Sequence, residues 1–347
     1  MRSKKIYIQD ITQGQLVEDQ FIVIHSSQEQ AKNGPYWQLT LQDRTGTIPA
    51  RIWSPQSQNY PSIETEQILH IKASANIFRD QLQLNIDHLE FVPLEESDLA
   101  FFLPVSSVPP EDLYRELFRL LKATVVFPPW ITFYKQVLKD ARIKELLLKA
   151  PGGKSIHHAY IGGLLEHTVG VCRICRTISE LYPDMDRDIL MVAAALHDIG
   201  KAMEISSGIT RDYTREGRLL GHIFLGMEMI TPFLNKARNL PSGLKAHFKH
   251  LMLSHHGELE FGSPKRPKTR EAFVLHFADN LDAKLNTIDL ALEGSDQENP
   301  EGTWSGFQRS LGRYLFNPPR TPRPEPCADS EKMPVKKEVP CLSPLKE

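Results

Sequence analysis

The pattern of apolar residues changes near residue 93, and this change limits the folds that the chain can adopt. Residues 14–92 contain short apolar runs with a period of two, bounded by turn residues, which is typical of strands. After residue 110 the apolar period becomes helical and stays so to about residue 292. The sequence therefore predicts a multidomain protein, with a small β domain followed by an all-α domain. The expected strands cover 20–26, 36–43, 47–53, 67–78 and 82–91, and the expected helices cover 113–121, 133–147, 161–181, 189–196, 223–233, 244–253 and 273–292.

The expected strands have the spacing of a small Greek-key barrel. A longer Pro/Ser-rich connection separates the third strand from the fourth, which is the arrangement of the five-stranded OB-fold. Trp37, Leu39 and Leu41 fall on one side of their strand, because successive side chains point to opposite faces. We therefore expect these three residues in the core of a β-barrel of the OB-fold type.

Four segments follow from the changes in composition. We expect the barrel at 1–93, a Pro-containing linker at 94–110, the helical domain at 111–316 and a tail at 317–347. The tail is rich in Pro, Glu and Lys and cannot bury a core, so we expect it to be disordered.

Composition excludes few functions. With 41% hydrophobic residues and a formal net charge of −2, the chain has no global basic field that would indicate a nucleic acid partner. The start is basic but no apolar segment follows it, and no run approaches the roughly 18 apolar residues of a membrane span. We expect a cytoplasmic protein with no membrane partner, which could form a homo-oligomer.

Two of the four cysteines, Cys172 and Cys175, lie three residues apart within a helical pattern. Such a pair could be half of a zinc knuckle or a redox pair. Because no second pair exists and no strand precedes it, the pair is better interpreted as small buried helix residues.

Histidines and aspartates recur inside the apolar helical segments in a pattern typical of metal ligands. The pair His197-Asp198 in Ala-Ala-Leu-His-Asp-Ile-Gly-Lys is the most distinctive member. A lone buried histidine is usually structural, but here that interpretation would have to hold several times over. Mixed nitrogen and oxygen ligands suit Mn, Fe, Co, Ni, Zn or Mg, and two-metal sites of this kind serve phosphoester hydrolysis. The candidate ligands are His167, His197, Asp198, His222, His255, His256 and Asp279.

Asp198 has two carboxylate oxygens and could bridge two ions. His167, His197 and Asp279 would then hold one ion, and His222 with the pair His255-His256 the other. Neighbours on a helix point about 100° apart, so His255 and His256 are not expected to be equivalent, and one of them could orient a ligand instead.

Further residues near the expected metal centre carry possible roles in catalysis. Lys201 follows the His-Asp pair by one turn and could meet a phosphate oxygen, although a solvated lysine at a helix end is the alternative. His158 could orient substrate or protonate the leaving oxygen, although a capping or packing role is the alternative.

Exposed aromatic and basic residues of the expected barrel could bind a strand of nucleic acid. Base stacking on an aromatic ring contributes on the order of 1–3 kcal/mol and tolerates any sequence. However, residues 1–93 hold 8 Lys/Arg against 10 Asp/Glu, so the barrel is no strongly basic binder, and these residues could instead close the barrel or pack on the second domain. The candidates are Tyr36, Arg51, Trp53, Phe78 and Arg79.

The order of the candidate ligands along the chain resembles that of the HD-domain metal-dependent phosphohydrolases. The segments that carry the resemblance are Leu-Leu-Glu-His167-Thr, Leu-His197-Asp198-Ile-Gly-Lys201, Gly-His222, Ser-His255-His256-Gly and Phe-Ala-Asp279-Asn-Leu-Asp282. The stretch from Lys154 to His167 is similar to the bacterial YhaM-type 3′-5′ exoribonucleases, which also carry an OB domain before the HD domain. This resemblance covers roughly residues 1–315. It implies metal-dependent hydrolysis of single-stranded RNA from the 3′ end, with DNA as an alternative substrate, Mn or a similar ion as cofactor and nucleoside 5′-monophosphates as products.

Two other functions stay open at this stage. One is an HD-domain phosphodiesterase or phosphatase for a small signalling nucleotide, but Phe261-Gly-Ser-Pro264 replaces the Gly-Tyr-Pro element of the cyclic-dinucleotide branch. The other is a non-catalytic nucleic-acid-binding protein that keeps the HD fold, against which the intact set of ligands argues.

Overall fold

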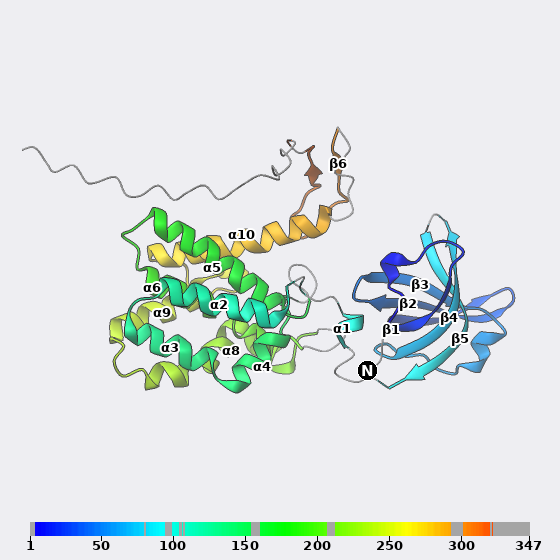
Figure 1. Ribbon diagram of the computed structural model, residues 1–347, viewed down its shortest axis with the longest axis horizontal. Helices are drawn as coiled ribbons and strands as arrows, with labels where there is room; N and C mark the ends of the chain where they lie inside the picture. The colour runs from blue at the N-terminus through cyan, green and yellow to red at the C-terminus, as the bar shows by residue number, and fades with distance from the viewer. Residues whose placement is uncertain are drawn as a thin grey trace, which may run out of the picture. The chain divides into compact units, whose positions relative to one another are not determined.

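The computed structural model describes residues 4–79, 81–93, 99–103, 106, 108–153, 160–206, 212–292, 301–319 and 321. Two compact units divide the chain, Met1–Leu290 and Ala291–Glu347. The first unit holds a β-barrel and a set of helices, shown from blue to yellow in Figure 1. Among the described residues, no helix is long and apolar enough to cross a membrane.

The five expected strands are confirmed and form a closed barrel in the order β1-β2-β3-β5-β4. All neighbouring pairs are antiparallel except β3 and β5, which pair in parallel at Ala50 and Arg51. The barrel is therefore of the OB type, as the spacing predicted. The strands are β1 (Leu16–Ala31), β2 (Gly34–Asp43), β3 (Gly46–Ile52), β4 (Ile68–Phe78) and β5 (Gln81–Val92).

Alternation along the strands fills the barrel. Trp37, Leu39 and Leu41 on β2 are buried, as are Ile48 and Ile52 on β3. They pack with apolar residues of β1, β4 and β5 into one continuous core. The expectation for the core face of β2 is therefore confirmed.

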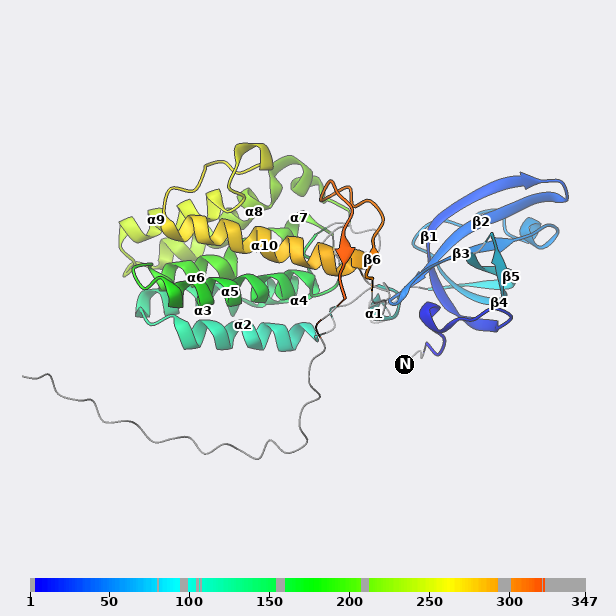
Figure 2. The same ribbon diagram turned by 90° about the horizontal axis from the view of Figure 1, so that it is seen from above.

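The helical part packs around a second apolar core, which includes Trp130, Phe133 and Phe248. Figure 2 shows α10 lying alongside α5, and a hydrogen bond between His167 on α5 and Asp282 on α10 ties the two helices together. Buried helices of this kind hold polar side chains rigidly, because their backbones are fixed along their whole length. The helices are α1 (Leu99–Phe102), α2 (Pro110–Thr124), α3 (Pro128–Leu138), α4 (Ala141–Lys149), α5 (Gly163–Leu181), α6 (Arg187–Leu196), α7 (Lys201–Glu204), α8 (Arg215–Lys236), α9 (Ser242–Ser254) and α10 (Arg270–Leu292).

The helix expectations hold in outline and differ in two places. The run 133–147 is two helices, because the side chain of Asp140 accepts hydrogen bonds from the backbone N–H groups of Arg142 and Ile143 and so begins α4. The stretch expected as a linker contains the short helix α1, whose Phe102 packs on Ile22 and Ile68 of the barrel. Cys172 and Cys175 are fully buried free thiols on α5, which confirms the expectation for the pair.

The second unit contributes one small hairpin of β6 (Thr303–Trp304) and β7 (Phe316–Asn317). The tail expected to be disordered was 317–347, but its first residue, Asn317, pairs with Thr303 in the hairpin, so that boundary was wrong by at least one residue. Residues 320 and 322–347 of this tail lie outside the described residues.

Candidate metal centre

The His197-Asp198 pair lies in a turn and not on a helix as expected. Helix α6 ends at Leu196, and α7 begins at Lys201. His197 closes α6, and its ring Nδ1 lies 2.9 Å from the carbonyl oxygen of Ala194. Because the chain leaves the helix here, His197 and Asp198 both point inward, and both are almost completely buried.

Four side chains from three parts of the helical domain form a first group of possible metal ligands, namely His167, His197, Asp198 and Asp279. The Nε2 atom of His167 lies 3.2 Å from Oδ1 of Asp279 and 3.4 Å from Oδ2 of Asp198. The Nε2 atoms of His167 and His197 are 3.3 Å apart. One ligand atom from each residue lies within 4.8 Å of all the others, so a single ion could contact the four.

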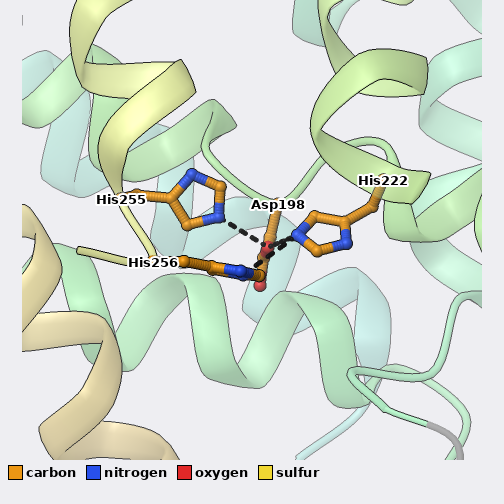
Figure 3. A group of neighbouring side chains, drawn as sticks. All are labelled: Asp198, His222, His255 and His256. Carbon is orange, nitrogen blue, oxygen red and sulfur yellow. Dashed lines mark hydrogen bonds and ion pairs between the residues drawn. The ribbon is translucent and has the colours of Figure 1, made fainter. Parts of the chain in front are cut away.

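A second group contains Asp198, His222, His255 and His256, as Figure 3 shows. The Nε2 atoms of His222 and His255 lie 3.4 and 3.5 Å from Oδ1 of Asp198. The Nε2 atom of His256 lies 3.1 Å from that of His222. Two adjacent histidines reach one site because α9 ends at Ser254, so the helical separation of about 100° does not apply to them.

Asp198 belongs to both groups, as the bridging role requires. Its Oδ1 faces His222 and His255, whereas its Oδ2 faces His167 and His197. Both oxygens are buried, and the Lys201 ammonium, 2.6 Å from Oδ2, is the cation that contacts them in the part of the chain that the structure describes. Around Oδ1 lie the ring nitrogens of His222 and His255, so this oxygen forms no hydrogen bond there, and a divalent cation between these groups would satisfy it.

All five histidine rings are oriented in the same way. The Nδ1 atom of each ring contacts an oxygen, to which its N–H donates, so that Nε2 is the nitrogen that faces the other members of the two groups. The Nδ1–oxygen distances are 2.7 Å for His167 with Asp282, 2.9 Å for His197 with Ala194, 3.1 Å for His222 with Glu204, 2.8 Å for His255 with Met252 and 2.8 Å for His256 with Phe261.

The protonation states of the cluster follow from burial and from neighbouring charges. Burial lowers the pKa of His197 to about 4 and, together with the rings of His255 and His222, also lowers the pKa of His256 to about 4. Burial opposes protonation of His167 too, but hydrogen bonds to Asp198, Asp279 and Asp282 outweigh it and raise its pKa well above the usual value. In the metal-free protein, His197 and His256 are therefore neutral at physiological pH and His167 carries a proton.

Lys201 faces the centre and is not a solvated lysine at a helix end. Its Nζ lies 2.6 Å from Oδ2 of Asp198, and its side chain is only 12% exposed. Burial alone would lower the pKa of Lys201, but the Asp198 carboxylate raises it above the usual value. Burial would likewise raise the pKa of Asp198, whereas the Lys201 ammonium keeps it well below its usual range. The two groups are therefore charged.

Two carboxylates that support the centre were not singled out from the sequence. Asp282 contacts Nδ1 of His167, and Gly170 gives it room, because a Cβ at Gly170 would lie 2.1 Å from Oδ1 of Asp282. Glu204 contacts His222 at two points, with Oε1 3.0 Å from the backbone N and Oε2 3.1 Å from Nδ1. One signal was available for Asp282, since it follows Asp279 by one helical turn within the resemblance.

A break in α8 explains the contact between Glu204 and the backbone of His222. Gly221 has φ +73° and ψ 157°, so a new helical segment begins at His222. The first N–H groups of a helix have no intrahelical partner, and Glu204 accepts the one of His222. Apart from the glycine itself, no residue pattern indicates this break.

The other expected catalytic residue, His158, lies outside the described residues. Of the remaining histidines near the centre, His276 places its Nδ1 2.8 Å from the backbone oxygen of His255. It therefore supports the turn that carries the His255-His256 pair.

The five candidate nucleic-acid-binding residues of the barrel form one connected cluster. The rings of Tyr36 and Trp53 are stacked with their centroids 4.8 Å apart. The Arg51 guanidinium lies 5.3 Å from the Trp53 ring and 5.1 Å from the Phe78 ring, and that of Arg79 lies 5.3 Å from the Phe78 ring. None of the five belongs to the apolar core of the barrel, so closure of the barrel does not explain them.

Comparison with known proteins agrees with the geometry. Residues 164–284 match the HD domain family. The chain is 34% identical over 291 residues to the 3′-5′ exoribonuclease YhaM of Bacillus subtilis, covering 79% of this chain and 87% of that protein. It is 34% identical to the YhaM protein of Shouchella clausii, covering 81% of this chain and 87% of that protein. The second OB-fold domain of replication protein A from Methanococcus maripaludis matches 26% of this chain and 96% of its own chain, at 14% identity and a TM-score of 0.23.

The assignment of the barrel rests on its own strand order and does not need the last of these similarities. The resemblance expected from the motifs is confirmed by the two sequence relatives, whose alignments span most of both chains. The chain belongs to the YhaM family of HD-domain exoribonucleases.

Proposed function

We propose that this protein is a metal-dependent 3′-5′ exonuclease that hydrolyses single-stranded RNA to nucleoside 5′-monophosphates. Its YhaM relatives are named 3′-5′ exoribonucleases and align with most of the chain. The observation that carries the proposal is the pair of four-ligand groups that share Asp198. Adjacent sites with one bridging carboxylate are suited to phosphodiester hydrolysis.

The donor set supports two divalent ions. Each group offers imidazole nitrogen and carboxylate oxygen, which suit Mn, Co, Fe, Ni, Zn or Mg, and we take Mn as the first choice because the resemblance to the YhaM-type enzymes implies it. When bound, such ions activate water and stabilise negative charge on the phosphate oxygens. We assign His167, His197 and Asp279 to one ion, His222, His255 and His256 to the other, and Asp198 to both.

Lys201 would bind the substrate phosphate. Its ammonium is buried beside Asp198, where a compact cation can reach an oxygen of a phosphate that contacts the ions. In the metal-free protein this ammonium is held by Asp198, and positive ions on Asp198 would release it toward the substrate. We propose His158 as a further catalytic residue on the basis of the sequence alone.

The barrel would bind the strand, through the cluster formed by Tyr36, Arg51, Trp53, Phe78 and Arg79. Stacked rings with a guanidinium beside them bind bases and phosphates without selecting a sequence. We therefore assign residues 1–93 to strand binding and 111–316 to hydrolysis. We also propose a cytoplasmic location, which is compatible with the free buried thiols of Cys172 and Cys175.

The proposal is tested with a single-stranded RNA that carries a label at its 5′ end, incubated with purified protein and Mn. We expect a ladder that shortens nucleotide by nucleotide, the release of nucleoside 5′-monophosphates, and no reaction after chelation of the metal. A circular RNA should survive, because it has no 3′ end. A matching DNA strand measures the preference between RNA and DNA.

Two results would contradict the proposal. Rapid cutting of the circular strand would identify an endonuclease. Turnover of a cyclic dinucleotide without any action on polynucleotides would identify a phosphodiesterase for a signalling nucleotide.

A further inference from the structure

The hairpin of residues 303–317 presents large aromatic side chains to solvent. Trp304 is 69% exposed, Tyr314 60%, Phe307 52% and Phe316 39%. By contrast, Trp37 and Trp130 are buried in the two cores of the first unit. Single exposed rings occur elsewhere on the protein, such as Tyr182 and Phe261, but here four are grouped within 13 residues, and a group of exposed rings indicates a binding surface.

Backbone pairing fixes these rings in two pairs. Trp304 and Phe316 are partners in the register of β6 and β7, and their ring centroids are 5.0 Å apart. Phe307 and Tyr314 form a second pair, with centroids 5.2 Å apart. Between the second pair and the tip, Gln308 forms a bridge with Arg313. The rings are therefore held by the hairpin before any ligand arrives, so little ordering entropy is lost on binding.

The charge of the hairpin selects the class of ligand. Residues 303–317 contain Arg309 and Arg313 and no Asp, Glu or Lys. Both arginines are exposed, and neither forms an ion pair within the part of the chain that the structure describes. The Nε–H of Arg313 donates to the backbone oxygen of Leu311 at 3.0 Å, which leaves its terminal N–H groups for a ligand. Exposed rings and guanidinium groups on one short hairpin match a single strand of nucleic acid, which offers a base face and a phosphate at every nucleotide.

We propose that the hairpin of residues 303–317 is a second binding element for single-stranded nucleic acid, in addition to the barrel. Trp304 and Tyr314 stack on bases, while Arg309 and Arg313 neutralise phosphates. The kind of strand rests on the proposed function, but the binding itself does not, because binding is measured without catalysis. A protein partner for the same rings is the competing interpretation.

The test measures binding of a single-stranded RNA of about 20 nucleotides, longer than the roughly 4–16 that one OB barrel covers. Metal-free full-length protein is titrated with the labelled strand, so that no cleavage occurs. We expect Trp304→Ala with Tyr314→Ala to raise the dissociation constant at least about tenfold, because two stacking contacts are lost. Trp304→Phe with Tyr314→Phe keeps both rings and should bind within about threefold of wild type.

Two further variants separate stacking and charge from general damage. Tyr182→Ala removes a tyrosine of equal exposure at the end of α5, 62% exposed, and should leave the dissociation constant unchanged. Arg309→Ala with Arg313→Ala should reduce the slope of log affinity against log salt by about 1.4, since each phosphate contact on a single strand contributes about 0.7. Circular dichroism and the unfolding midpoint check that each variant is folded.

A folded Trp304→Ala/Tyr314→Ala protein that binds the strand as wild type does would overturn the proposal. If that variant also changes its oligomeric state, the rings serve a protein contact. If the folded double variant binds the strand as wild type does and the wild-type protein degrades RNA, only the proposal for the hairpin is refuted and the proposed exonuclease activity stands. Failure of wild type to degrade RNA would remove the exonuclease, and the binding data would still decide on the hairpin.

Discussion

Substitution of Glu204 by Gln should weaken metal binding without weakening the fold. The carboxylate of Glu204 accepts a hydrogen bond from the His222 backbone with one oxygen and contacts the ring Nδ1 with the other. In the Gln variant the amide oxygen must face the backbone N–H, so its NH₂ group faces Nδ1. The ring must then place its proton on Nε2, which is the atom that would bind the ion.

The expected loss follows from this change of tautomer. Replacing a residue that orients a metal ligand costs about 10- to 100-fold in metal affinity, or roughly 1.4 to 2.8 kcal/mol. We expect a loss of this size at the group formed by Asp198, His222, His255 and His256. The unfolding midpoint of the metal-free protein should stay near that of wild type, because the amide oxygen still satisfies the buried N–H.

Glu204→Ala is the matched comparison. It leaves the His222 N–H buried without a partner, which costs about 1–3 kcal/mol of stability in addition to the loss of metal affinity. Calorimetric titration of the metal-free proteins with Mn, combined with thermal unfolding, separates the two effects. If Glu204→Gln binds both ions as tightly as wild type, the inferred role of Glu204 in orienting His222 is refuted.

Three further predictions concern the strand, the pH dependence and the thiols. Tyr36→Ala with Trp53→Ala should weaken the binding of long oligonucleotides far more than it slows the cleavage of a dinucleotide, because stacking acts away from the metal centre. Equal losses on both substrates, measured by steady-state kinetics, would indicate a purely structural barrel. The pKa of His167 is raised, so its proton must leave when an ion binds. Metal affinity should therefore increase by up to about tenfold per pH unit through the neutral range, until the pH exceeds that pKa. An affinity that stays constant with pH in metal titrations would contradict the assignment of His167 as a ligand. Burial raises the pKa of the Cys172 and Cys175 thiols, so an alkylating reagent should modify them only after unfolding. Rapid labelling of the native protein, detected by peptide mass spectrometry, would show that solvent reaches this face of α5 and would contradict the burial of the two thiols.

The sequence predicted the barrel well because strand alternation is a local signal. A period of two fixes which residues of β2 enter the core, whatever the neighbouring strands are. The end of α6 at Leu196 agrees with the predicted range 189–196, but the turn conformation of His197 and Asp198 was harder to predict, because no Gly or Pro separates the apolar run from the pair. The structure brings the candidate ligands together as two close groups, whereas the path of the backbone that does so was not predicted.

Supporting residues were missed for a different reason. Glu204 is one of 43 acidic residues, and nothing in its local pattern distinguishes it from a solvated glutamate. Its role depends on the break at Gly221, which turns the His222 N–H toward it. Such contacts between distant segments depend on tertiary packing, which no periodicity in a single sequence encodes.

The most direct test of the two-metal account is a metal count made together with an activity measurement on wild type and Asp198→Ala. Asp198 contributes an oxygen to each ligand group, so its loss should leave fewer than the two ions per chain expected for wild type. The variant should also fail to shorten a 5′-labelled single-stranded RNA, while circular dichroism shows that its helices remain. An Asp198→Ala protein that shortens RNA at the wild-type rate would contradict the account and remove this centre as the site of hydrolysis.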